Sequence, residues 1–158
     1  MPVLHIPVGI PGCGKSSLAP VINPNALIVS SDAIREEMGD VYDQSRNDEV
    51  FLEFHERIED FLTAGFDVYA DATSLNKFAR DKLFGLAVRV SEGYPAGQGV
   101  TTHILLFRNL EQAIRRNSLR EVPVPGEAML RMIEKYEQTI QSIYDEGWDH
   151  ITEISKVS

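Results

Sequence analysis

The sequence has almost no cysteine and no long hydrophobic run. Cys13 is the single cysteine among 158 residues, so an internal disulfide framework is excluded. No stretch approaches the roughly 20 apolar residues of a membrane span, and the N-terminus lacks the features of a signal peptide. A cytoplasmic protein without membrane contact is therefore predicted. With 43% hydrophobic residues, the chain suffices for one well-packed domain, predicted to cover residues 1–158.

Positive charge is also scarce. Lysine and arginine number 15 against 24 acidic residues, which gives a net charge of −9. Proteins that bind long stretches of nucleic acid usually present a basic surface instead. The imbalance is uneven, because residues 36–60 hold ten acids and two arginines, whereas residues 108–131 hold five arginines and three glutamates. We therefore expect any nucleic acid partner to be gripped locally, at a short end.

Short apolar runs alternate with helical patterns along the chain. The predicted strands are 3–8, 26–30, 66–71, 102–107 and an edge strand at 151–154. The predicted helices begin at 16 and occupy 33–38, 47–64, 77–90, 110–119 and 126–146. Asn47 or Asp48 would cap the helix 47–64, and its apolar stripe is predicted to belong to the core: Val50, Phe51, Phe54, Ile58, Phe61 and Leu62. This alternation is typical of an α/β fold with a parallel sheet and helices on both faces. In such folds, ligands bind at the carboxyl ends of the strands.

The segment GIPGCGKSS follows the first predicted strand and opens the first predicted helix. Gly9-x-x-x-x-Gly14-Lys15-Ser16 is the pattern of a phosphate-binding loop in its required context. Lys15 would reach the outer phosphates of ATP or another NTP, and Ser16 would offer its hydroxyl to Mg²⁺ or Mn²⁺. The nucleotide-binding residues predicted in this loop are Gly12, Cys13, Gly14, Lys15, Ser16 and Ser17.

Two other classes of nucleotide-dependent protein fit less well. A switch GTPase carries Asn-Lys-x-Asp, whereas Asn76-Lys77-Phe78-Ala79 lacks the aspartate. A motor ATPase usually ends a strand with an acidic pair, whereas Asp71 is followed by Ala72. The pattern favours a kinase that transfers phosphate to a bound acceptor.

Asp32 and Arg35 follow the second predicted strand in SSDAIR, next to the predicted phosphate loop. Asp32 would accept the proton of an attacking hydroxyl as general base, and Arg35 would hold an anionic group of the acceptor. The alternative is structural, with Asp32 or Ser31 capping a short helix and Arg35 pairing with a glutamate.

A second carboxylate, Asp71, closes the third predicted strand in DATSLN. It would position the metal shell or pair with an arginine that closes over the site, and the alternative is an Asx turn. Arg116 and Arg120 are four residues apart and are predicted to share one helix face in a lid at about 108–126. Both would neutralise charge during transfer, and the alternative, strongest for Arg115, is a solvated basic face.

The segments GIPGCGKSS, SSDAIR, DATSLN and RRNSLREVPVPGEAMLRMIEKYE resemble the 5′-hydroxyl polynucleotide kinases of phage and nucleic acid repair enzymes. The resemblance covers nearly the whole chain. It implies transfer of the γ-phosphate of ATP to the 5′-hydroxyl end of RNA or DNA, with no phosphatase or ligase domain. It also implies that Lys15, Asp32, Arg116 and Arg120 are catalytic, that Arg116 and Arg120 contact the nucleotide, and that Arg35 and Asp71 serve the acceptor.

Related kinases act on small metabolites, nucleotide sugars or modified bases in DNA, and their first 80 residues look similar. A non-catalytic module that uses the loop to sense ATP is a further alternative. Cys13 occupies a variable position of the loop and is expected merely to fit there, and the alternative hypothesis is a reactive thiol whose pKa the loop amides and Lys15 would lower. His5, His55, His103 and His150 lack ligand spacing, so no protein-bound transition metal is predicted.

Overall fold

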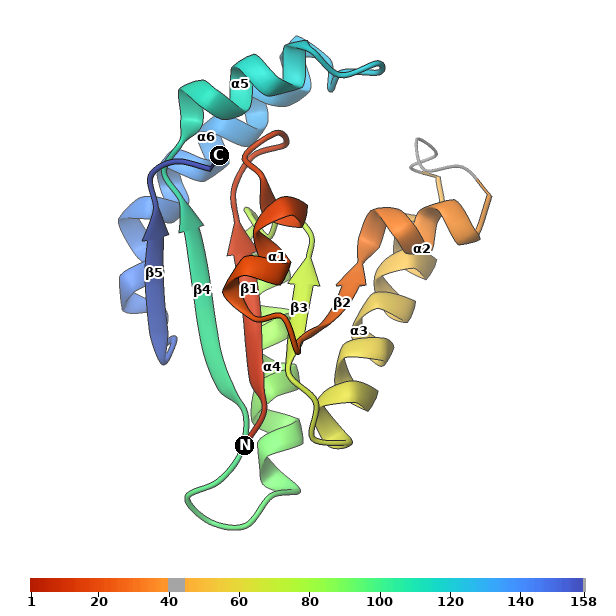
Figure 1. Cartoon of the computed structure of the whole chain (residues 1–158), viewed down its shortest axis with the longest axis vertical. Helices are drawn as coiled ribbons and strands as arrows, with labels where there is room; N and C mark the ends of the chain where they lie inside the picture. The colour runs from red at the N-terminus through yellow and green to blue at the C-terminus, as the bar shows by residue number, and fades with distance from the viewer. Residues whose placement is uncertain (40–44, 158) are drawn as a thin grey trace.

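The computed structural model describes residues 1–39 and 45–157, and five parallel strands form one sheet within these residues (Figure 1). The strands are β1 (Val3–Val8), β2 (Leu27–Ser30), β3 (Val68–Asp71), β4 (Thr101–Phe107) and β5 (His150–Ile154). Their spatial order is β2-β3-β1-β4-β5, which confirms the predicted parallel α/β fold and places β5 at an edge.

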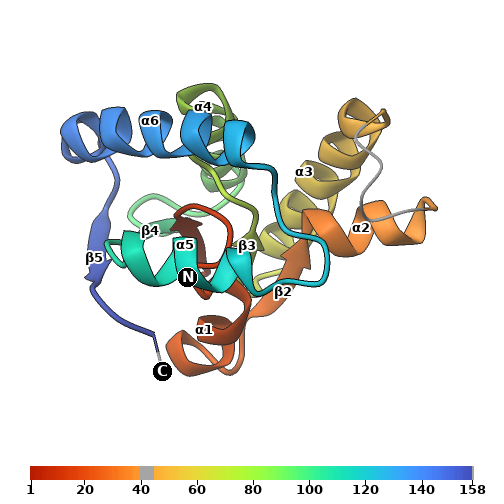
Figure 2. The same cartoon turned by 90° about the horizontal axis from the view of Figure 1, so that it is seen from above.

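Helices cover both faces of this sheet, as predicted. They are α1 (Lys15–Ile22), α2 (Ser31–Glu37), α3 (Asn47–Thr63), α4 (Lys77–Glu92), α5 (Leu110–Ser118), α6 (Gly126–Ser142) and the 3-10 turn η1 (Ile143–Asp145). Figure 2 shows α1 on one side of the sheet, α4 and α6 on the other, and α5 across the carboxyl ends of the central strands. None of the helices in the described ranges is both long and apolar enough to cross a bilayer.

The core lies around the central strands because these are covered on both sides. Leu4, Ile6 and Val8 of β1 are fully buried, and all four residues of β3 are buried as well. Strands buried on both faces are expected in a parallel sheet whose crossovers are helices. In α3, the predicted apolar stripe is buried at Val50, Phe54, Ile58 and Leu62.

The register of the sheet brings three of the histidines into one row. His5 in β1 pairs with His103 in β4, and His103 pairs with His150 in β5. The Nδ1 atoms of His5 and His103 are 2.8 Å apart, so their rings share a hydrogen bond. Strand pairing therefore brings together histidines that lie about 50 to 100 positions apart in the sequence, which their spacing did not indicate. Among the described residues, no group of His, Cys, Asp or Glu is arranged to hold a metal.

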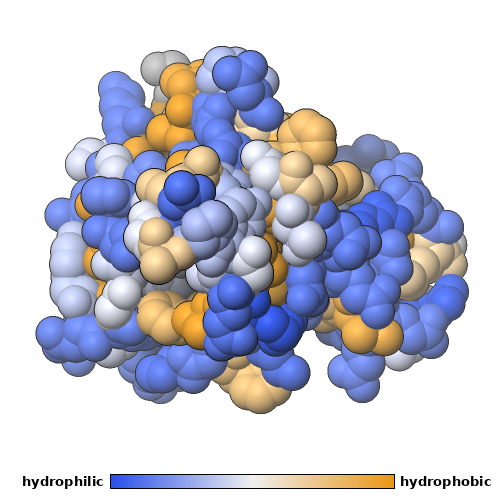
Figure 3. All heavy atoms as spheres, turned by 90° about the horizontal axis from the view of Figure 1, so that it is seen from below, coloured by the Kyte–Doolittle hydropathy of each residue, from blue (hydrophilic) through white to orange (hydrophobic). Residues whose placement is uncertain are grey.

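The two ends of the strands differ in character. Seen from the amino-terminal ends of the strands, polar side chains cover most of the surface and the apolar ones are scattered (Figure 3). The phosphate loop and the helix α5 lie at the opposite edge (Figure 1). The candidate site is therefore sought at the carboxyl ends, where ligands of this fold class bind.

Candidate functional site

The phosphate loop between β1 and α1 needs glycine at two positions. Gly12 has a φ of 91°, and a Cβ atom there would lie 2.4 Å from the backbone oxygen of Ala113 in α5. Gly14, the residue before α1, has a φ of 99°. A side chain at either position would be strained, and at Gly12 it would also collide with α5.

Three hydrogen bonds from other elements fix the loop. The Tyr69 hydroxyl donates to the Lys15 backbone oxygen at 2.6 Å, and the Asn109 amide donates to the Cys13 backbone oxygen at 2.9 Å. The Gly9 backbone N–H donates to the Thr73 oxygen at 3.3 Å. The loop is thus held from β3, from α5 and from the segment after β3, before any phosphate binds. Preorganised amides of this kind lower the reorganisation needed to bind an anion.

Ser16 and Asp71 meet at the carboxyl edge of the sheet. The Ser16 hydroxyl donates a 2.7 Å hydrogen bond to Oδ2 of Asp71. Ser16 lies in the first turn of α1, where the positive end of the helix dipole faces the loop, and Asp71 is the last residue of β3. Two oxygen ligands of the type that Mg²⁺ prefers therefore stand side by side next to Lys15.

Asp32 lies one strand farther from the loop than the sequence suggested. Strand β3 lies between β2 and β1, and Ser30 of β2 pairs with Asp71 of β3. The expectation that Asp32 directly neighbours the loop is therefore wrong, because the chain crosses over β3 before it reaches β2. Ser30, rather than Ser31 or Asp32, caps α2, since its Oγ accepts a hydrogen bond from the Ala33 N–H.

The Arg35 guanidinium joins Asp32 to α3. Its Nη1 donates to Oδ1 of Asp32 at 2.6 Å, and its Nη2 donates to Oδ1 of Asn47 at 2.7 Å. The Arg35 side chain is 7% exposed, whereas that of Asp32 is 70% exposed. Its Nε is buried and has no partner within the described residues. The buried arginine thus holds an accessible carboxylate in a fixed direction, and the carboxylate that it contacts is Asp32 and not a glutamate, as the structural alternative had it.

Arg116 lies against the phosphate loop. Its Nη2 donates to the Val157 backbone oxygen at 2.7 Å, and its Nη1 is 3.2 Å from where a Cβ atom on Gly14 would stand. Arg120 lies beyond α5, which ends at Ser118, and it is exposed. The prediction that the two arginines share one helix face is therefore wrong.

Asn117 accounts for the end of α5. Its side chain accepts a hydrogen bond from the Val124 N–H and donates one to the Val124 oxygen. These bonds tie the segment after the helix back onto it, so the residues between them leave the helical path. Arg115, like Arg120, is exposed.

Cys13 is buried, which agrees with the expectation that it merely fits into the loop. Its side chain is 1% exposed, and a Cβ atom on Gly9 would lie 2.6 Å from its Sγ. Burial raises the pKa of the Cys13 thiol, and Lys15, whose Nζ is 3.9 Å away, offsets this only in part. The hypothesis of a reactive thiolate is therefore wrong, because the side chain is buried and its raised pKa makes the thiol harder to deprotonate.

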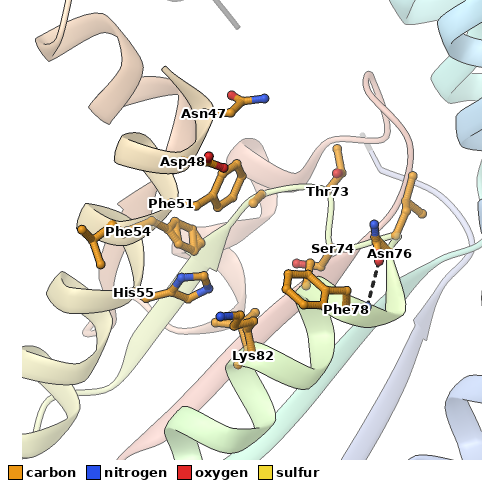
Figure 4. Close-up of a pocket in the computed structure, with 15 residues that line it drawn as sticks. Asn47, Asp48, Phe51, Phe54, His55, Thr73, Ser74, Asn76, Phe78 and Lys82 are labelled. Carbon is orange, nitrogen blue, oxygen red and sulfur yellow. Dashed lines mark hydrogen bonds between the residues drawn. The ribbon is translucent and has the colours of Figure 1, made fainter. Parts of the chain in front are cut away.

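A cavity of about 560 Å³ opens beside Asn47, between α3 and the start of α4 (Figure 4). We call it the α3–α4 pocket. Its lining residues from α3 and from the segment 72–83 are Asn47, Asp48, Phe51, Leu52, Phe54, His55, Ala72, Thr73, Ser74, Leu75, Asn76, Phe78, Ala79, Lys82 and Leu83. Figure 4 shows the side chains of Phe51, Phe54 and His55 on one wall, facing Ser74 and Phe78 on the other.

Several residues of the site were missed by the sequence analysis. Phe51 was assigned to the core with the rest of its helical stripe, yet it is half-buried and lines the pocket. Asn47 was expected to cap α3, yet it is the first helical residue and binds Arg35 instead. Tyr69 and Asn109 gave no signal, because a side chain that supports a loop 54 or 96 residues away follows no local pattern.

A central parallel strand that leads through a glycine loop into a helix defines a P-loop nucleotide-binding domain. Residues 4–139 match the AAA domain family AAA_33, and the chain belongs to that family. This membership by itself specifies no acceptor and no reaction.

Solved structures that share the fold include three kinase or RNA repair proteins. The chain superimposes on one in a Pnkp1/Rnl/Hen1 RNA repair complex with a TM-score of 0.72 and 18% identity, covering 89% of this chain and 46% of that one. A fungal RNA kinase gives 0.65 and 14%, covering 99% and 77%. A gluconokinase from Sinorhizobium meliloti 1021 gives 0.54 and 15%, covering 99% and 83%. This chain thus spans about half the length of the first, and the likenesses establish a P-loop kinase-like fold.

Proposed function

We propose that the protein is a polynucleotide 5′-hydroxyl kinase, which transfers the γ-phosphate of ATP to the 5′ end of RNA or DNA. The observation that carries this proposal is the chain of contacts from Asp32 through Arg35 to Asn47, at the edge where Ser16 meets Asp71. The pairing of Ser30 with Asp71 supports the proposal, because α2, which carries Asp32 and Arg35, begins directly after Ser30 at the same edge of the sheet. The similarity in fold to an RNA kinase supports the same reading.

On the donor side, Lys15 and the amides of the loop would hold the phosphates of ATP. Ser16 and Asp71 would hold Mg²⁺, Ser16 directly and Asp71 through the metal's water shell. The bound ion would neutralise charge on the outer phosphates of the nucleotide. Arg116 lies beside Gly14, and it would contact the same phosphates once its hydrogen bond to the Val157 oxygen is broken. Arg120 lies beyond the end of α5 and would reach the phosphates only if the segment after α5 moves.

On the acceptor side, Asp32 would take the proton of the 5′-hydroxyl as general base. Both Nη groups of Arg35 are engaged, one of them by Asp32. An acceptor phosphate that binds Arg35 would therefore compete with Asp32 for the guanidinium. That competition would free Oδ1 of Asp32 for the hydroxyl proton only when an acceptor is in place.

A labelling panel tests the proposal. The protein is incubated with Mg²⁺, γ-labelled ATP and one acceptor at a time: a 5′-hydroxyl RNA, a 5′-hydroxyl DNA, their 5′-phosphate controls, gluconate and a nucleotide sugar. We expect label only on the 5′-hydroxyl strands. Label on gluconate or on the nucleotide sugar alone would replace the proposal with its main alternative, a small-acceptor kinase, which the fold of the gluconokinase also accommodates.

A further inference from the structure

The α3–α4 pocket is lined by two aromatic rings, those of Phe51 and Phe78, that are not fully buried in the core. Phe78, in the first turn of α4, is 67% exposed although it lines the pocket. Phe51 of α3 is half-buried, and its ring centroid is 5.6 Å from that of the buried Phe54. An exposed ring at the mouth of a pocket gains little from folding, but its flat face is available to stack on a planar ligand.

Two amide groups in the pocket are available as hydrogen-bond donors. Asn47 and Asn76 each use their Oδ1 atom, which accepts from Arg35 and from the Phe78 N–H respectively. Neither Nδ2 group donates a hydrogen bond to any residue in the described part of the chain. A planar ligand with ring nitrogens or carbonyl oxygens at its edge would satisfy such donors.

The charges in the pocket favour a neutral ligand over an anionic one. Lys82 and Asp48 carry opposite charges, and the Nζ of Lys82 is 5.3 Å from the centre of the Phe78 ring. Burial lowers the pKa of His55, so its imidazole is neutral at pH 7. The pocket therefore offers no surplus of positive charge to a phosphate or to the carboxylate of a sugar acid.

A single guanidinium separates this pocket from the candidate general base. Arg35 donates to Asn47 in the pocket wall with one Nη group and to Asp32 with the other. A nucleoside has a matching layout, because one ribose separates its base from its 5′-hydroxyl. A hydroxyl placed at Asp32 would thus leave the attached base at the pocket.

We propose that the α3–α4 pocket binds the terminal nucleobase of the acceptor strand by stacking on Phe51 and Phe78. This inference rests on the proposed function, and it narrows the acceptor to one that carries a base next to its hydroxyl. Stacking also explains how an acidic protein grips a strand end, since the affinity comes from a neutral group.

The first test changes the acceptor strand, by removing its terminal nucleobase, and leaves the protein unchanged. KM and kcat are measured for a 5′-hydroxyl oligonucleotide and for the same strand with an abasic terminal residue. A stacked base contributes about 1–3 kcal/mol, so we expect KM for the abasic strand to rise about 5- to 150-fold. In Phe51→Leu and Phe78→Leu this ratio should fall towards one. Phe66→Leu should keep the wild-type ratio, because Phe66 is a half-exposed aromatic that lies just before β3, outside the pocket lining.

A second test needs no turnover. Fluorescence of 2-aminopurine riboside is titrated with the wild-type protein and with Phe78→Leu. We expect quenching by the wild type and weaker binding by the variant. If the normal and the abasic strand are both phosphorylated with equal KM, the pocket does not bind the terminal base, and the kinase assignment stands. Riboside binding that depends on Phe78, without phosphorylation of any strand, would overturn the kinase assignment while leaving the pocket. Absence of both phosphorylation and riboside binding would overturn both.

Discussion

The hydroxyl of Ser16 and the carboxylate of Asp71 are joined by a 2.7 Å hydrogen bond, which links the first turn of α1 to the last residue of β3. The two residues are 55 positions apart in the chain. Asp71 orients the hydroxyl that we propose as a metal ligand, and its carboxylate adds a negative charge to this edge of the sheet.

Asp71→Asn tests this relationship. The variant keeps the size of the side chain and its ability to accept from Ser16 but removes the charge. We expect the Mg²⁺ concentration for half-maximal ATP binding, measured by calorimetry, to rise about 10- to 100-fold. Asp81→Asn is the matched control, because Asp81 forms only an exposed ion pair with Lys77. An unchanged Mg²⁺ curve in Asp71→Asn would remove Asp71 from the metal shell.

Asp32→Ala tests the assignment of the general base. We expect phosphate transfer to fall by about 10²- to 10⁴-fold, while binding of ATP measured by calorimetry stays the same. Glu36→Ala, an exposed acid of the same helix, should have full activity. Transfer that survives in Asp32→Ala would show that another group accepts the proton. Lys15→Ala would not separate these outcomes, because it removes nucleotide binding as well.

The salt dependence of acceptor binding tests how the strand is held. A protein that grips only a short end neutralises few phosphates. For two or three phosphates of a single strand, the slope of log K against log salt concentration should be about −2. We would measure it by fluorescence anisotropy with a labelled 5′-hydroxyl strand between low and physiological salt. A steep slope, as from eight contacts, would indicate a long footprint instead.

The buried pair of Arg80 and Glu146 should dominate the stability of the segment after β3. Arg80 donates to both carboxylate oxygens of Glu146, at 2.9 and 2.7 Å, and its Nη1 donates to the Ser74 and Leu75 backbone oxygens. Burial alone would raise the pKa of Glu146, but hydrogen bonds from Arg80 and Trp148 hold it below its ordinary value.

Arg80→Ala leaves the Glu146 carboxylate buried without its partner. We expect the free energy of unfolding, measured with urea, to fall by about 3–5 kcal/mol. Arg89→Ala breaks an exposed pair with Glu59 and should cost less than about 1 kcal/mol. A similar loss in both variants would mean that the buried pair contributes no more than a surface pair.

His5 should make the protein less stable in acid. Burial, followed by the neighbouring His103, lowers the pKa of His5 to about 4, although Asp67 acts in the opposite direction. Asn23 donates to Nε2 of His5 and to Asp67, so a neutral His5 donates through Nδ1 to His103. Protonating His5 would put a charge into this closed set of hydrogen bonds.

Between pH 6.5 and about 4, His5 is protonated in the unfolded chain but neutral in the folded protein. Stability therefore falls as the pH drops through this window, by up to about 3 kcal/mol from His5. We expect urea midpoints of His5→Gln to depend less on pH in this range than those of the wild type. His150→Gln, at an exposed position of the edge strand, is the control. An equal pH dependence in wild type and His5→Gln would contradict the prediction.

Most of the fold could be predicted from local patterns. Apolar runs of four to seven residues alternate with segments of helical periodicity. Each of these hydrophobic patterns lies within a single strand or helix, so it can be recognised without knowing which elements pack together. The ends of elements were less predictable. Helix α6 ends at Ser142 rather than at residue 146, because the chain passes into the 3-10 turn η1 at Ile143–Asp145, and the helical periodicity does not distinguish the two.

The sequence by itself determined the phosphate loop, because Gly14, Lys15 and Ser16 lie in one short segment that ends the loop and begins α1. The tertiary structure alone decided that Asp71 rather than Asp32 meets Ser16, because strand order is set by how crossovers pack. It also decided that Phe51 and Phe78 face one pocket. Contacts between distant residues depend on which elements become neighbours, and no local pattern encodes that choice.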